Sequence, residues 1–112
     1  MTTRAGAGLW VAQRVTAAIL AFCVLVHLVT MVYAVRGGLT AAQILDRTHA
    51  SVAWGAFYSL FVLAAGVHGA IGLRTVASEW LAFRGRVADA AMGLAGVAII
   101  VLGLRAVAAV VL

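Results

Sequence analysis

Residues 15–35 read VTAAILAFCVLVHLVTMVYAV, an apolar run that lies between Arg14 and Arg36. As an α-helix, a run of this length spans about 30 Å, which is the thickness of the hydrocarbon core of a bilayer. The run is too long, and too poorly supplied with a cleavage motif, for a removable signal peptide. We therefore expect it to be a retained transmembrane helix.

Two further apolar runs account for most of the remaining chain. The second begins at Ala50 and is closed by Arg74, and the third runs from Ala90 to Leu112 with Arg105 inside it. Of the 112 residues, 66% are hydrophobic, 10% are charged and none is proline, which is unlike a soluble domain. The sequence predicts an all-α integral membrane protein, a single membrane domain over residues 1–112. Its three transmembrane helices are expected at about 12–36, 50–76 and 88–111.

The charged residues lie mainly at the ends of these segments. All eight basic residues are arginines, and they give the chain a net charge of +5 because only three residues are acidic. Arginines that flank membrane segments, without a basic patch, indicate no nucleic-acid-binding surface. The N-terminus and the second loop carry more arginines than the other side of the membrane, which favours a cytoplasmic N-terminus. These arginines are Arg4, Arg14, Arg74, Arg84 and Arg86.

Most polar residues of the first helix share one face. At about 100° per residue, a single stripe holds a set of mostly polar residues. They are Gln13, Thr16, Leu20, Cys23, His27 and Thr30. We expect this stripe to face a helix bundle, and we expect the single cysteine to serve packing.

The second helix holds His68 among small residues. An imidazole inside hydrocarbon is a candidate functional residue, and neutral imidazole is a common axial ligand of haem iron. A porphyrin beside His68 is therefore favoured. For the small residues alone, close helix packing is the better explanation, as it is for the glycines of the third helix. The two sets are Ala64, Ala65, Gly69 and Gly72, and Gly93, Gly96 and Gly103.

Two of the three histidines are expected at different depths in the membrane. His27 follows Arg14 by about 20 Å of helix, whereas His68 precedes Arg74 by about 9 Å, measured from the same side. A height difference of roughly 10 Å makes a shared haem improbable, so each histidine would need a partner imidazole from elsewhere. His49 lies at the outer start of the second helix and is expected to be an ordinary interfacial residue.

Several motifs together resemble a known family. Residues 13–16 read QRVT, His27 follows Gln13 by fourteen residues, residues 68–74 read HGAIGLR, and residues 79–80 read EW. Over about residues 10–86 this pattern resembles the membrane anchor subunits of succinate dehydrogenases and fumarate reductases. The resemblance is greatest to the small anchors that work in pairs, and it implies a three-helix, cytochrome b-like unit that packs with a partner anchor into a haem-binding bundle.

The resemblance also implies roles for individual residues. His68 matches the axial ligand of the haem b nearer the iron–sulfur subunit, and His27 matches the ligand of the outer haem b found in two-haem members. Arg74 stands where the family often has an arginine near haem propionates. Arg105 has no firm counterpart, which leaves snorkelling and pairing with an outer propionate both open.

A quinone site is implied at the inner end of the helices. Gln13, Arg14 and Thr16 fall where family members place polar residues near the quinone head group. Glu79 and Trp80 stand where many of the paired anchors have Asp-Tyr, so the tyrosine hydroxyl is missing here. An indole N–H from Trp80 is one substitute for it, and a tyrosine from the partner anchor is another.

The implied function is electron relay between an iron–sulfur subunit and membrane quinone, in a bacterial cytoplasmic membrane, through one or two b-type haems. The expected partners are a flavoprotein subunit, the iron–sulfur subunit, a second anchor and the lipid bilayer. The chain has no dinucleotide-binding fingerprint and no cysteine cluster, so it is not an enzyme on its own. The direction of the reaction and the type of quinone stay open.

Two alternatives also stay open. The first is an anchor or assembly subunit without haem, in which both histidines make interhelical hydrogen bonds. The second is a small membrane transporter, which normally has four spans and a carboxylate inside the membrane. The transporter is disfavoured, because the sequence has three apolar runs and its acidic residues lie near or outside the interfaces. The anchor without haem is to be distinguished by an absorption spectrum.

Overall fold

The computed structural model describes residues 4–112, and all regular secondary structure in that range is helical. The elements are α1 (Arg4–Arg36), α2 (Ala41–Thr48), α3 (Val52–Trp80) and α4 (Arg86–Val111). Three of them, α1, α3 and α4, are long and apolar enough to cross a membrane. The prediction of an all-α protein with three transmembrane helices is confirmed.

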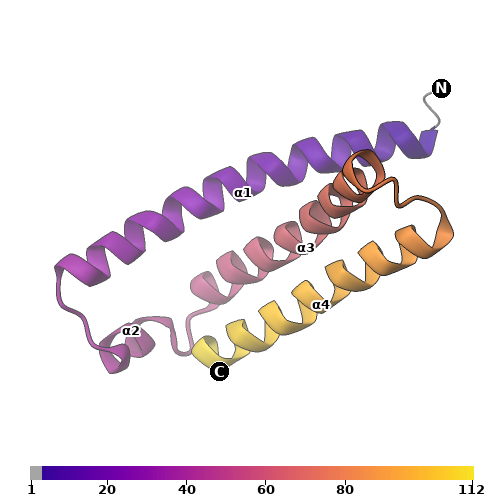
Figure 1. Cartoon of the computed structure of the whole chain (residues 1–112). Coiled ribbons are helices and arrows are strands. Elements are labelled where there is room, and N and C mark those ends of the chain that lie inside the picture. The colour runs from indigo at the N-terminus through magenta and orange to yellow at the C-terminus, as the bar shows by residue number, and fades with distance from the viewer. Residues whose placement is uncertain (1–3) are drawn as a thin grey trace.

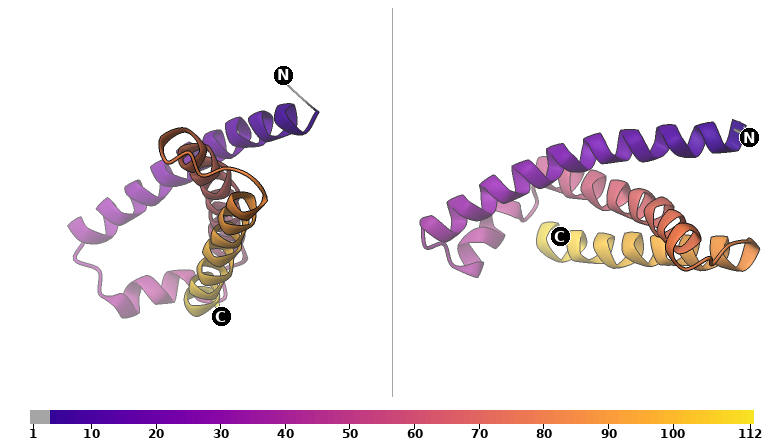
Figure 2. Two further views of the ribbon diagram at one scale, coloured as in Figure 1. Left: turned by 45° about the vertical axis from the view of Figure 1, so that its right-hand side comes forward. Right: turned by 45° about the horizontal axis from the view of Figure 1, so that its top comes forward.

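The long helices form an elongated bundle of 52 × 25 × 22 Å in which α3 is central. Helix α3 lies between α1 and α4 and packs against both (Figures 1 and 2). The predicted polar stripe of α1 is its more buried face, because Thr16 and Cys23 are buried and the other members are half-buried. The stripe therefore faces the bundle as predicted, and the cysteine is a packing residue with no exposed surface.

Close packing of α3 on α4 depends on small residues. A Cβ atom at Gly96 would lie 2.7 Å from Cβ of Ala70 and 3.0 Å from the carbonyl oxygen of Gly66, so neither helix leaves room for a side chain there. Gly103 likewise lies against Val62. Small residues let membrane helices approach closely and gain van der Waals contact. The prediction that the glycines of this helix allow close packing is wrong for Gly93, because a Cβ atom there would meet nothing within 4 Å among the described residues.

The segment between α1 and α3 contains a helix that the sequence prediction treated as loop. Helix α1 ends at Arg36 and is followed by Gly37 and Gly38. Gly38 has a φ of 64°, a conformation that favours glycine. Thr40 then begins α2 with a capping box, because its hydroxyl accepts from the backbone N–H of Gln43 while the Gln43 side chain accepts from the N–H of Thr40. The two bonds satisfy backbone donors that would otherwise be free at the start of the helix.

Helix α2 is tied to the end of α4. The Thr48 hydroxyl donates to the carbonyl oxygen of Val110 at 2.8 Å. The backbone N–H of Ala50 donates to the carbonyl oxygen of Val111 at 2.7 Å. Carbonyls in the last turn of a helix have no partner within the helix, so these two bonds satisfy them. Helix α2 therefore covers the end of the bundle where α4 ends.

Helix α3 continues further than predicted, to Trp80. Its last turn closes with a hydrogen bond from the N–H of Phe83 to the carbonyl oxygen of Ala77, across Ala82 in the left-handed region at φ 53°. A residue in the left-handed region directly after the last turn is a common way for a helix to end. Glu79 and Trp80 are therefore on the last turn of α3 and not in the loop.

Candidate functional site

His68 lies at the contact between α3 and α1, opposite Thr16. The Thr16 hydroxyl oxygen is 3.2 Å from Nδ1 of His68 and 2.7 Å from the carbonyl oxygen of Ala12, one turn earlier in α1. A hydroxyl has one proton to donate and can accept as well. Donation to the carbonyl of Ala12, the shorter of the two contacts, leaves the hydroxyl oxygen free to accept from Nδ1 of His68 in the tautomer that carries its proton on Nδ1.

That tautomer of His68 leaves Nε2 as the nitrogen that can bind a ligand. With the proton on Nδ1, a neutral imidazole carries its free lone pair on Nε2. In residues 4–112, Nε2 has no hydrogen-bond partner and is not among the fully buried polar atoms. A half-buried imidazole with one nitrogen held and the other available is the arrangement that histidine ligands of metals adopt.

Gln13 lies next to this contact, one turn before Thr16 in α1. Its Nε2 atom would be 3.4 Å from a Cβ atom at Gly72, so the glycine makes room for the amide. The Oε1 atom of Gln13 is buried and has no hydrogen-bond partner within residues 4–112. Gly69 lies against Ile99 of α4, so both glycines next to His68 serve helix packing.

His27 lies at a different depth from His68, beside an apolar hollow of about 630 Å³. Its ring centroid is 5.9 Å from those of Tyr58 and Phe61. Phe61 precedes His68 by seven residues of α3, about 10 Å of helix, which agrees with the predicted difference in depth. Nδ1 of His27 is buried without a hydrogen-bond partner in the described residues, whereas Nε2 is not fully buried.

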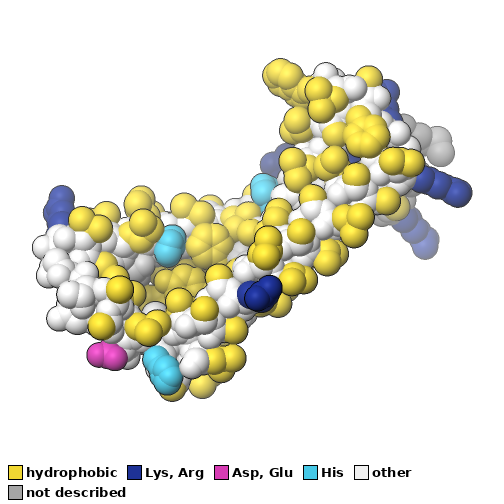
Figure 3. All heavy atoms as spheres, turned by 60° about the horizontal axis from the view of Figure 1, so that its bottom comes forward, with side chains coloured by type: hydrophobic (Ala, Val, Ile, Leu, Met, Phe, Trp, Pro, Cys, Tyr) yellow, Lys and Arg dark blue, Asp and Glu magenta, His cyan; other side chains and the backbone are white. Residues whose placement is uncertain are grey.

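The hollow beside His27 is lined by residues of all four helices, with α2 as one wall. Apolar side chains cover most of the face of the molecule in Figure 3, and most of the arginines visible there lie at one end. Ligand sites for small molecules range from about 300 to 1,000 Å³ and are mostly apolar. Size and lining thus suit a hydrophobic ligand with one nitrogen donor from the chain.

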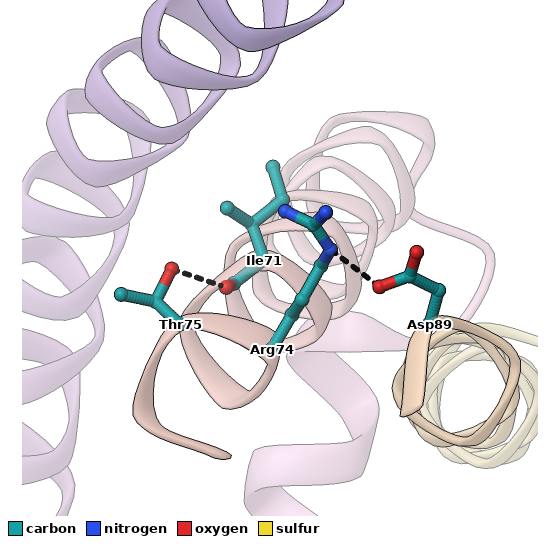
Figure 4. Close-up of polar contacts among 4 residues, drawn as sticks. All are labelled: Ile71, Arg74, Thr75 and Asp89. Atoms are coloured by element: carbon teal, nitrogen blue, oxygen red, sulfur yellow. Dashed lines mark hydrogen bonds and ion pairs between the residues drawn. The ribbon is translucent and has the colours of Figure 1, made fainter. Parts of the chain in front are cut away.

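Arg74 has a partner within the chain. Its Nε atom is 2.6 Å from a carboxylate oxygen of Asp89, which joins the C-terminal part of α3 to the first turn of α4 (Figure 4). Both side chains are about half exposed, at 48% and 51%. A guanidinium has five N–H donors, and no other hydrogen bond of this side chain occurs among residues 4–112, so its remaining donors are available to an anionic group.

A polar hollow of about 340 Å³ lies beside this ion pair. Glu79 and Arg84 line it together with Arg74 and Asp89, and Arg84 donates to the carbonyl oxygen of Ser78 at 3.1 Å. The charged groups that surround the hollow come from the last turns of α3, the following turn and the start of α4.

The residues predicted for the quinone neighbourhood fall into separate places. Thr16 and Gln13 lie against α3, while the guanidinium of Arg14 faces outward over the ring of Trp10 at 4.8 Å. Trp80 is 80% exposed at the end of α3. No hydrogen bond or ion pair in residues 4–112 joins the α1 group to Glu79 or Trp80.

Arg105 and His49 make no side-chain hydrogen bond or ion pair with any described residue. Arg105 is exposed on α4 near the residues that line the hollow of His27, and His49 is exposed at the end of α2.

Some features of the site were not anticipated from the sequence. The Thr16 contact with His68, the two aromatic rings around His27 and the choice of Asp89 as partner of Arg74 all depend on how the helices are aligned against one another. A sequence signal existed only for the rings, because Tyr58 and Phe61 are three residues apart and share a face of α3.

The family model described as "Succinate dehydrogenase/Fumarate reductase transmembrane subunit" matches residues 1–111. A search of curated proteins found no match, and neither did a search of solved structures. The chain belongs to this family of transmembrane subunits: it is a multi-pass membrane anchor of an oxidoreductase complex and not a catalytic subunit on its own.

Proposed function

We propose that this anchor binds haem b through Nε2 of His68 and contributes to a quinone site, so that electrons pass between the iron–sulfur subunit and membrane quinone. The observation that carries the proposal is the hydrogen bond between Thr16 and Nδ1 of His68. A histidine that binds a metal nearly always donates its other N–H to an oxygen, which fixes the tautomer and the ring orientation. When bound, haem supplies one-electron redox chemistry.

A second anchor subunit is part of this proposal. The chain supplies one imidazole at the depth of His68 and one at the depth of His27, and each available nitrogen lies at its surface or in an open hollow. A six-coordinate haem needs two axial ligands. A partner anchor packed against this face would supply the second ligand and close the site.

His27 suits a second haem in part. Its Nε2 atom is accessible beside a hollow of suitable size, and Arg105 on α4 offers an unpaired cation at the outer half of the bundle. Its Nδ1 atom, however, lacks the oxygen partner that His68 has in the described residues. We therefore assign His68 as the primary ligand and His27 as the ligand of an outer haem if two are bound.

The end of the bundle that carries most of the arginines is proposed to face the iron–sulfur subunit and to hold the quinone head group. Quinone oxygens accept hydrogen bonds, and Gln13 and Arg14 carry donors on α1, as does Trp80 at the end of α3. Arg74 keeps donors free beside its ion pair, which suits a propionate of the inner haem. With five arginines at this end, the N-terminus would lie in the cytoplasm of a bacterial cell.

An anchor without haem remains the alternative function, and one observation favours it: His68 does make an interhelical hydrogen bond. That bond occupies only Nδ1, so it does not account for the available Nε2 atom.

The test is a dithionite-reduced minus oxidised absorption spectrum of the purified complex, with haem quantified per complex. We expect a b-type α-band and one or two haems. A complex that contains all subunits and turns over quinone but shows no such band would contradict the haem assignment and favour the alternative.

A further inference from the structure

We propose that Thr16 is a positioning residue for His68: its hydroxyl oxygen accepts the Nδ1–H bond, keeps Nε2 as the iron-binding nitrogen, and strengthens the electron donation of the imidazole. This inference rests on the proposed haem function. It concerns a different property, the reduction potential of the haem that His68 binds.

The backbone supplies acceptors for the proton of the Thr16 hydroxyl. The carbonyl oxygens of Ala12 and Gln13 lie 2.7 Å and 3.2 Å from the hydroxyl oxygen, on the same helix. The residue is only 9% exposed, so water does not compete for the oxygen from most sides. With its proton donated to the backbone, the oxygen can accept a hydrogen bond from Nδ1 of His68, which lies at 3.2 Å.

The other intramembrane histidine shows that this contact is not a general feature of threonines in α1. Thr30 is a half-buried threonine of α1 that lies three residues after His27, but its hydroxyl donates to the backbone carbonyl of His27 at 2.7 Å. The ring nitrogen Nδ1 of His27 stays without a partner in the described residues. Thr30 therefore provides a matched control for the loss of a threonine hydroxyl from α1.

The electronic consequence has a definite sign. An acceptor at Nδ1–H increases the basicity of a ligating imidazole, which is the usual effect of such an outer partner. A more basic ligand stabilises the more highly charged ferric state over the ferrous state. Removal of the acceptor is thus expected to raise the reduction potential of the haem bound by His68.

The experiment compares the purified complexes that carry Thr16→Val, Thr16→Ala and Thr16→Ser with the wild-type complex and with Thr30→Val. Each sample is titrated potentiometrically while the b-type α-band is followed, and haem content is measured separately. Valine matches threonine in shape, alanine avoids any overpacking by the second methyl group, and serine keeps the hydroxyl.

In both apolar variants we expect the stabilisation of ferric over ferrous haem to fall about three- to tenfold. For a one-electron couple this raises the reduction potential of the haem by about 30–60 mV. That range corresponds to the net worth of one neutral hydrogen bond. Serine should restore the wild-type potential, and Thr30→Val should leave it unchanged. If valine and alanine lose the haem while serine keeps it at the wild-type potential, the hydroxyl is again the group responsible.

Three results would overturn the inference. They are an unchanged potential in both apolar variants, a serine variant that behaves like valine, and an equal shift in Thr30→Val. Failure of the haem proposal itself is distinguishable, because the wild-type complex would then lack the α-band, or His68→Ala would retain all of it.

Discussion

The substitution Gly96→Ala tests the packing of α3 on α4. A Cβ atom at this position would lie 2.7 Å from Cβ of Ala70, whereas carbon atoms in contact are normally about 3.5–4.0 Å apart. The second neighbour, 3.0 Å away, is the backbone oxygen of Gly66, which has no rotamer to change. The helices must therefore separate by about 1 Å near this point.

Gly93→Ala is the matched control, because it lies one turn earlier in the same helix and has open space around the new methyl group. Both substitutions gain helix propensity by about 0.5–1 kcal/mol, so this term cancels between them. Overpacking at a tight contact typically costs about 1–3 kcal/mol. We expect the Gly96 variant to be less stable than the Gly93 variant by that amount.

The assay is unfolding of the purified chain in mixed micelles by titration with sodium dodecyl sulfate, followed by tryptophan fluorescence. Trp54 lies on α3 within a cluster of aromatic rings, where it stacks on Tyr58 at 5.5 Å, so its emission reports loss of packing. A shared transition midpoint for the two variants, or a higher midpoint for Gly96→Ala, would refute the helix contact described above.

Three further substitutions probe other parts of the chain. His27→Leu should remove at most one haem from the purified complex and leave the haem of His68, and loss of both, measured by difference spectroscopy, would contradict separate sites. Asp89→Asn removes a half-exposed ion pair worth about 0.2–1 kcal/mol, so the midpoint of thermal unfolding should fall by no more than a few degrees. A larger drop would contradict this estimate for the ion pair. Thr48→Val removes the bond to the Val110 carbonyl and should cost about 0.5–1.5 kcal/mol; unchanged stability and unchanged protease sensitivity of α2 would show that this bond does not hold the segment in place.

The three spanning helices were predictable because hydropathy accumulates over a whole segment. Their ends were less predictable, since a helix end is decided by a few local hydrogen bonds. Helix α3 passes Arg74 because its closing bond forms only at Phe83. Helix α2 could have been anticipated from Thr40 and Gln43, whose spacing is that of a capping box.

The candidate site was predictable as a set of residue types and not as a set of contacts. His68 stood out because an imidazole in hydrocarbon needs a partner, but the sequence does not show that Thr16 provides one. That contact depends on the axial alignment and rotation of α1 against α3. Gly93 and Gly96 illustrate the same point, because only their rotation around α4 decides which of them faces α3.

The most direct test of the central claim compares His68→Ala with His49→Ala in the purified complex. The proposal assigns iron binding to Nε2 of His68, whereas His49 is exposed at the C-terminal end of α2. We expect His68→Ala to lose the b-type α-band of one haem in the reduced minus oxidised spectrum, while His49→Ala keeps the wild-type spectrum. An undiminished band in an assembled His68→Ala complex would contradict the assignment of His68 as a haem ligand.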